Sequence, residues 1–197
     1  FILVLCDQIL KIWIKTHMVL GQEYSIFDWF IIHFTENNGM AFGLELGGEY
    51  GKVLLTVFRI IVVVFGINYI AVLTKKNLSS GSLISLGLIV GGAIGNIIDS
   101  LFYGLLFNES FNNIASFLPE AGGYAPLLHG KVVDMFYFPL INSHFPNWLP
   151  IWGGEHFIFF RPVFNIADSA ISIGVGVLLV FNKKAFPEKA GIKAQKR

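Results

Sequence analysis

Two aspartates, Asp134 and Asp168, are the residues whose type and setting best suit chemistry. Asp168 lies in the segment VFNIADSAI, at the head of an apolar run that continues to Phe181, and Asp134 lies upstream in KVVDMF. An ionisable side chain at membrane depth is costly and usually has a function. Two carboxylates that are held close share one proton, so one acts as a base while the other acts as an acid. Such a pair can activate water against a peptide carbonyl without a metal or a covalent intermediate.

The distance in sequence, from position 134 to position 168, does not establish that the two carboxylates meet. Asp168 could instead cap a helix, and Asp134 could lie in a solvated turn. The residue types alone leave both interpretations open.

A second polar group stands in FTENNGMAFG. Asn38 and Gly39 predict a tight turn, because both tolerate positive φ. Asn37 could instead direct its amide, which both donates and accepts hydrogen bonds, at a substrate backbone. Asn37 and Gly39 are therefore candidate site residues, with a plain turn as the alternative.

The segment that ends in GGAIGNIID carries Gly87, Gly91 and Gly95 at intervals of four, a stripe that predicts close helix packing. Asn96 and Asp99 follow on one helix face. Because buried polar groups need partners, we expect these two to form the floor of a polar site, with helix capping as the alternative.

Other charges stand within apolar surroundings. Asp7 and Lys11, four residues apart, predict a structural ion pair. Arg59, within FRIIVVV, needs a carboxylate or a water-filled cavity. Asp99 or one of the two central aspartates is the expected partner of Arg59.

The elements that must position these residues are membrane helices. The 197-residue chain is 54% hydrophobic and 14% charged, with a mean hydropathy of +0.66. Crossing a bilayer takes roughly 20 mostly apolar residues per helix. Four segments qualify, at about 1–19, 53–73, 83–106 and 163–181, and they predict one membrane-embedded domain.

Basic residues set the expected orientation. Lys75 and Lys76 follow the second segment, and six of the 14 Lys and Arg residues lie in the tail at 183–197. By the positive-inside rule these ends are cytoplasmic. Both termini are then cytoplasmic, the segments 20–52 and 107–162 are extracytoplasmic, and the aspartates lie near the outer face.

Two extracytoplasmic stretches favour strands, Trp29 to Phe34 and Val132 to Phe138, because they are rich in β-branched and aromatic residues. They predict a small sheet at the membrane surface. The stretch from His144 to Phe160 is dense in aromatic rings, which suits the headgroup layer, so we expect it to lie on or dip into the bilayer.

Composition excludes several function classes. A formal net charge of +1, with basic residues gathered in a tail, argues against nucleic acid as a partner. The five histidines lack a metal-ligand spacing such as HExxH, and no G-x-S-x-G motif is present, so neither a metal site nor a serine triad is expected. The lone Cys6 cannot form an internal disulfide.

Four motifs in order, ENNGMAF, GGAIGNIID, VVDMFYF and FNIADSAI, resemble lipoprotein signal peptidase (signal peptidase II), and the match spans nearly the whole chain. The resemblance implies an intramembrane aspartic endopeptidase of the bacterial inner membrane. Such an enzyme cleaves prolipoproteins before the diacylglyceryl-modified cysteine. It further implies a four-helix α-helical integral membrane protein with a small extracytoplasmic β-cradle and an interfacial helix or loop.

The resemblance also implies residue roles. It makes Asp134 and Asp168 the catalytic dyad, and Asp7 and Lys11 match the family's first-helix pattern. The supporting and substrate-binding positions are Asn37, Asn96, Asp99 and Asn165. Membrane lipids and prolipoproteins are the expected partners, no cofactor is needed, cyclic peptide antibiotics are possible inhibitors between the two aspartates, and a monomer is expected.

The sequence departs from the family pattern in two places. Ser100 stands where many relatives carry Arg, and we hypothesise that Arg59 or Lys131 supplies that charge. The stretch from Leu105 to Lys131 is longer than in the compact family pattern, and it could act as a lid over the site or merely decorate the surface.

Two rival classes remain at this level. A small ion-coupled transporter could relay protons through Asp7, Arg59, Asp99 and Asp168, although the inverted repeats typical of many transporters are absent. A structural partner subunit could use the glycine stripe as its interface, but it leaves the two central aspartates unexplained.

Overall fold

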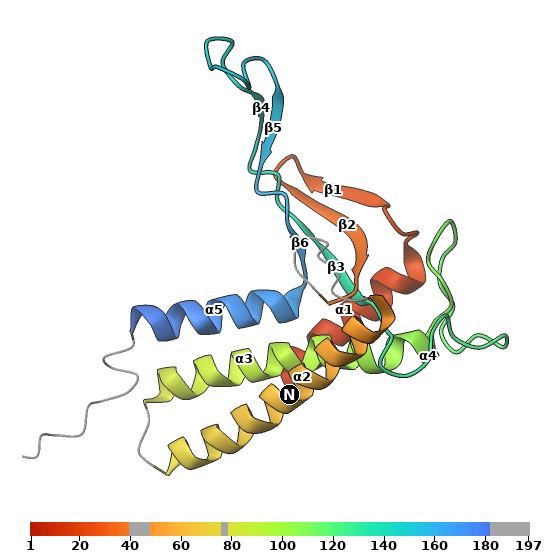
Figure 1. Ribbon diagram of the computed structural model, residues 1–197, viewed down its shortest axis with the longest axis vertical. Coiled ribbons are helices and arrows are strands. Elements are labelled where there is room, and N and C mark those ends of the chain that lie inside the picture. Colours follow the sequence, from red (N-terminus) through yellow and green to blue (C-terminus); the bar gives the residue numbers. More distant parts are fainter. Residues whose placement is uncertain (40–47, 76–78, 182–197) are drawn as a thin grey trace, which may run out of the picture.

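The structure is a computed structural model that describes residues 1–39, 48–75 and 79–181. Its helices run side by side below a small sheet, from which a thin hairpin projects (Figure 1). The helical elements are α1 (Ile2–His17), α2 (Gly48–Thr74), α3 (Ser80–Ile98), the π-helical turn η2 (Asp99–Tyr103), α4 (Gly104–Leu106) and α5 (Ile166–Val180).

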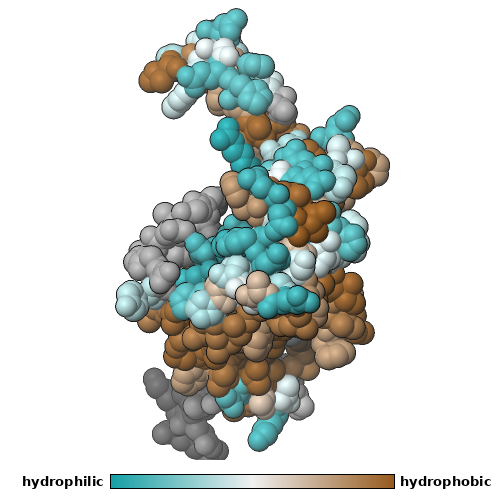
Figure 2. Space-filling model, turned by 90° about the vertical axis from the view of Figure 1, so that its right-hand side faces the viewer, coloured by the Kyte–Doolittle hydropathy of each residue, from teal (hydrophilic) through white to brown (hydrophobic). Residues whose placement is uncertain are grey.

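Two helical stretches are long and apolar enough to cross a membrane, Tyr50–Thr74 and Ser80–Leu106. The helix α5 is apolar but has only 15 residues, and α1 carries Asp7, Lys11 and Lys15. Hydrophobic surface covers the helical part, whereas hydrophilic side chains predominate above it (Figure 2). The four predicted crossings therefore have two clear counterparts among the described helices.

The helices α3 and α5 pack closely through glycines. A Cβ added at Gly92 of α3 would lie 2.3 Å from the carbonyl oxygen of Ala167, and one at Gly174 of α5 would lie 2.6 Å from that of Ser85. Only glycine fits at such distances. These two glycines fix how near α5 comes to α3.

The predicted glycine stripe allows close helix packing, as expected, at two of its three positions. Gly91 and Gly95 face α1, where an added Cβ would meet Leu3 and Asp7, while a Cβ at Gly87 would meet nothing within 4 Å among the described residues. The tightest contact of α3 with α5 uses Gly92, which lies outside the stripe.

The main sheet is antiparallel, with strand order β1-β2-β3-β6. Its strands are β1 (Glu23–Phe27), β2 (Phe30–Asn37), β3 (Val132–Tyr137) and β6 (Val163–Phe164). The two predicted strands are confirmed as β2 and β3. Residues 163–164, predicted as helix, form β6 instead, because Asn165 caps a helix that starts at Ile166.

The long segment between η2 and β3 contributes Phe107 and Ala115 to the core, so it does more than decorate the surface. Its Ala115 amide donates to the carbonyl oxygen of Lys15 (3.2 Å), near the C-terminal end of α1. The segment joins the sheet and α1 in one hydrophobic cluster, which comprises Ile14, Met18, Phe34, Tyr103, Phe107, Ala115, Val133 and Met135.

The aromatic stretch before β6 forms a separate two-stranded sheet, with β4 (Ile141–His144) paired to β5 (His156–Phe159). It stands away from the main sheet (Figure 1). A hairpin therefore occupies the stretch for which an interfacial helix or loop was expected.

Candidate active site

Asp134 and Asp168 come together because β3 pairs with β6. Phe136 lies opposite Phe164, and Tyr137 opposite Val163, so the end of β6 delivers the start of α5 beside β3. Asp134 lies within β3 with 5% of its surface exposed, and Asp168 lies in the first turn of α5 and is half-buried. The alternative interpretation, that Asp134 lies in a solvated turn, is therefore wrong.

Asn165 links the two carboxylates. Its side-chain amide nitrogen donates to Asp134 Oδ1 (2.8 Å), while its side-chain oxygen accepts from the backbone amide of Asp168 (2.9 Å). Asp168 Oδ2 in turn accepts from the backbone amide of Asn165 (3.3 Å), which completes a capping box. Asp168 thus does cap the helix, as the alternative interpretation expected, but only with one oxygen.

The other oxygen of Asp168 accepts from the side-chain amide of Asn96 (2.7 Å). Lys11 Nζ donates to the side-chain oxygen of the same Asn96 (2.9 Å). An amide whose oxygen is held by a cation must present its nitrogen elsewhere. Lys11 therefore orients Asn96 toward Asp168.

Lys11 is the central cation of this network. It lies 2.9 Å from Asp7 Oδ2 and 2.8 Å from Asp99 Oδ2, and all three side chains are buried. Asp7 Oδ1 also accepts from the backbone amide of Ala167 (3.0 Å). The ion pair predicted within α1 is present, and it additionally ties α1 to α3 and to the start of α5.

The cation that contacts Asp99 is Lys11, and neither Arg59 nor Lys131 was needed for that contact. Lys131 lies elsewhere, 3.2 Å from Glu109 Oε2 and 3.6 Å from Glu36 Oε2. Arg59 donates to the carbonyl oxygen of Gly39 and interacts electrostatically with Asp168. Of the two cations considered for the role of the missing Arg, only Arg59 acts on a central aspartate.

Asn37 reaches Asp134 from the neighbouring strand. Its side-chain amide donates to Asp134 Oδ2, and its side-chain oxygen accepts from the backbone amide of Gly39 (2.5 Å). Gly39 has a φ of 90°, as the turn prediction requires, but residues 40–47 lie outside the described residues. Asp134 thus accepts two amide hydrogen bonds, one on each oxygen.

The pKa of Asp134 is raised to about 7, first by burial and then by the nearby carboxylate of Asp168. The hydrogen bonds from Asn37 and Asn165 and the charge of Lys11 oppose this rise. At neutral pH the carboxyl of Asp134 therefore exchanges a proton readily, which suits an acid or base.

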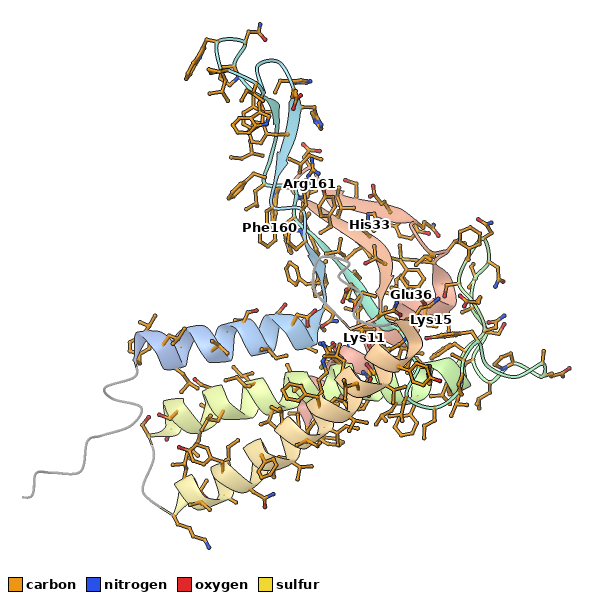
Figure 3. All side chains as sticks on the ribbon, viewed as in Figure 1. Lys11, Lys15, His33, Glu36, Phe160 and Arg161 are labelled. Carbon is orange, nitrogen blue, oxygen red and sulfur yellow. The ribbon has the colours of Figure 1, made fainter. Side chains whose placement is uncertain are left out.

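A second buried polar cluster, comprising Lys15, Glu36 and Ser110, was not anticipated from the sequence. Lys15 pairs with Glu36 and donates to Ser110 Oγ (2.8 Å). Figure 3 shows Lys15 and Glu36 where the helices meet the sheet, with Lys11 nearby. The available signal was spacing, because Asp7, Lys11 and Lys15 recur every four residues along one face of α1.

Gln8 is another contributor that the sequence analysis missed. It donates to Asp99 Oδ1 (2.9 Å) and accepts from the hydroxyl of Tyr103 (3.1 Å). As for metals, the described part of the chain contains no group of three or more His, Cys, Asp or Glu side chains arranged to hold an ion.

Known proteins resemble this chain over most of its length. The family model described as Signal peptidase (SPase) II matches residues 1–183. A lipoprotein signal peptidase of Porphyromonas gingivalis is 55% identical over 180 residues, which cover 91% of this chain and 78% of the relative. The chain belongs to the signal peptidase II family. Members of this family are aspartic peptidases, so the chain is a membrane endopeptidase of that class.

More distant relatives fit the same assignment. A lipoprotein signal peptidase of Amoebophilus asiaticus is 41% identical, covering 92% of this chain and 74% of the relative. A solved structure described as a bacterial membrane enzyme, determined by the in meso method, superposes with a TM-score of 0.59 and covers 96% of this chain and 88% of its own. At 22% identity, that structure supports the fold alone.

Proposed function

We propose that the chain cleaves prolipoproteins before their diacylglyceryl-modified cysteine, with Asp134 and Asp168 as the catalytic dyad. The observation that carries this proposal is the amide of Asn165, which contacts both aspartates and fixes them in one network.

The environments of the two carboxyls suit different tasks. Asp134 is more deeply buried and has a pKa of about 7, so it holds the shared proton at neutral pH. Asp168 is more exposed, so water reaches it more readily, and amide hydrogen bonds from Asn96 and Asn165 hold its two oxygens in place. In our proposal Asp168 takes a proton from water while Asp134 protonates the oxygen of the scissile carbonyl. The proton belongs to the pair, and the two exchange roles as the intermediate collapses.

Asn37, Asn96, Asp99 and Asn165 support the dyad in this proposal. Asn37 and Asn165 hold Asp134, and Asn96 holds Asp168. Asp99 acts through Lys11, which orients Asn96. Arg59, with Gly39, fixes the turn after β2 at the edge of the site.

The membrane setting follows from the helices. We propose four crossings by α1, α2, α3 and α5, with both termini cytoplasmic and the dyad near the outer face of the bacterial inner membrane. The substrate's signal helix enters sideways from the lipid while its acyl chains stay in the bilayer. The protein acts as a monomer, without a cofactor, and cyclic peptide antibiotics that inhibit such enzymes lodge between Asp134 and Asp168.

The decisive experiment replaces each aspartate by its isosteric amide. Purified wild type, Asp134→Asn and Asp168→Asn are compared for cleavage of a diacylglyceryl-modified prolipoprotein in nanodiscs. Each variant should lose at least ~100-fold in rate, because an amide cannot transfer the proton. The exposed Asp28→Asn in the turn between β1 and β2 is the matched control and should retain full activity. Substantial cleavage by either dyad variant contradicts the assignment.

A further inference from the structure

One face of the β4 and β5 hairpin, the apolar face, carries mostly hydrophobic residues with Ser143 among them, whereas the other face is mixed and includes Ile158. Directly opposed residues share a face in an antiparallel pair, and residues two apart share it as well. Ile141 lies opposite Phe159, and on the same face Phe145 stacks on Phe157 with ring centroids 4.4 Å apart. The other face carries His144 opposite His156.

The apolar face has no cover within the part of the chain that the structure describes. Ile141 is 50% exposed and Phe159 is 56% exposed. The hairpin pairs only with itself and stands apart from the main sheet. A lone two-stranded hairpin is at best marginally stable in water, and it needs something against which to pack.

The tip of the hairpin extends this apolar character. Trp148 is 79% exposed, Ile151 is 87% exposed and Trp152 is 53% exposed. Between Leu140 and Pro162 the chain has only two fully charged side chains, Glu155 and Arg161. Tryptophan next to uncharged polar groups is typical of the lipid headgroup layer.

The direction of the hairpin fits the same surface. It leaves the main sheet at the end of β6 that lies away from α5, and it extends roughly across the direction in which α3 and α5 run (Figure 1). In a bilayer that those helices span, the hairpin runs parallel to the membrane surface and does not point away from it. The exposed Phe160 and Arg161 at its base (Figure 3) offer a ring and a cation to that surface, which suits lipid phosphate.

We propose that the hairpin is a membrane-surface arm that lays its apolar face and its tip into the headgroup layer beside the helices. The arm is inserted in the sequence between Asp134 and Asp168, so it holds the β3 and β6 side of the sheet at the level of the lipid. The occupant of the face is lipid, and no second protein is needed to cover it.

Site-directed spin labelling in nanodiscs tests this arm. Single cysteines replace Ile151, Phe159, His144 and Glu120 in a Cys6→Ser background, and collisions with oxygen and with a water-soluble nickel complex are measured. Labels at 151 and 159 should be shielded from nickel and accessible to oxygen. The label at 144 on the opposite face, and the label at 120 in the 107–131 segment, should remain accessible to nickel.

Equal nickel accessibility at all four positions overturns the proposal. Shielding at 151 and 159 that requires two protein copies per nanodisc also overturns it, because the face is then an interface between copies. A second measurement guards against cysteine variants that fold poorly. In a Trp13→Phe/Trp29→Phe variant, the remaining Trp148 and Trp152 should be quenched by brominated lipids, and an absence of quenching contradicts the proposal.

Discussion

At the residue scale, the proposed chemistry depends on amide side chains as much as on carboxylates. Three asparagines contact the two aspartates, and the one on β2, Asn37, donates to the oxygen of Asp134 that Asn165 leaves free. Hydrogen bonds to a carboxylate favour its ionised form, so Asn37 and Asn165 lower the pKa of Asp134, which burial raises. The balance of these effects holds the pKa of Asp134 at about 7.

The first prediction concerns pH. Asp134 must be protonated to act as the acid, and its proton leaves as the pH rises through about 7, so cleavage should decline on the alkaline side of neutrality. Asn37→Leu removes a hydrogen bond that lowers the pKa of Asp134 and should move this decline to higher pH. The measurement is kcat/KM against pH in nanodiscs.

Asn113→Ala, in the 107–131 segment, serves as the control, because Asn113 bonds only locally to the carbonyl oxygen of Glu109. It should leave the pH profile unchanged. A profile that stays in place in Asn37→Leu would show that Asn37 does not act on the pKa of Asp134.

At the element scale, the contact between α3 and α5 sets the position of Asp168. Gly92→Ala places a methyl group against the carbonyl oxygen of Ala167, the residue before Asp168. The helices must separate, so we expect a loss of ~1–3 kcal/mol in stability and a strong loss of cleavage. Thermal unfolding and activity in detergent check both effects.

The matched variant is Gly87→Ala on the same helix, where an added Cβ meets nothing within 4 Å among the described residues. Because alanine favours a helix over glycine, this variant should be at least as stable as wild type. If both alanine variants behave alike, the close contact at Gly92 does not position Asp168.

A second element-scale prediction concerns the buried pair Lys15 and Glu36, which joins α1 to β2. Lys15→Met leaves the buried Glu36 carboxylate without its closest cation and should cost ~3–5 kcal/mol. The double variant Lys15→Met/Glu36→Leu removes both charges and should recover much of that loss. Thermal unfolding of Lys15→Met, of Glu36→Leu and of the double variant gives the coupling energy between the two side chains. If the two single effects simply add, the side chains are not a coupled pair.

At the scale of the whole molecule, the 107–131 segment and the β4 and β5 hairpin differ in importance for folding. The 107–131 segment contributes Phe107 and Ala115 to the core, whereas the β4 and β5 hairpin forms its own sheet. Replacing residues 141–159 by a short turn should therefore preserve a folded, monodisperse protein in detergent. Replacing residues 108–129 should abolish folding, as size-exclusion chromatography and thermal unfolding would show.

The sequence was most informative where charged residues stand within apolar segments. Asp134 and Asp168 could be singled out because carboxylates are rare in apolar segments, and β2 and β3 could be predicted from their β-branched and aromatic residues. The contact of Lys11 with Asp99 could not be predicted from the sequence, because it depends on how α1 packs on α3. The hairpin was hidden for a similar reason, since its ring-dense stretch fits a helix, a loop or a strand at a membrane surface equally well.

The ion pair within α1 also has a consequence for the order of biogenesis. Asp7 and Lys11 are neighbours on one helix turn, so they can pair as soon as α1 forms. Asp99 and the amide of Ala167, which complete the network, are synthesised much later in the chain. The pair within α1 can therefore form first, while Lys15 of the same helix still awaits Glu36, and the site becomes complete only when α5 docks against α1.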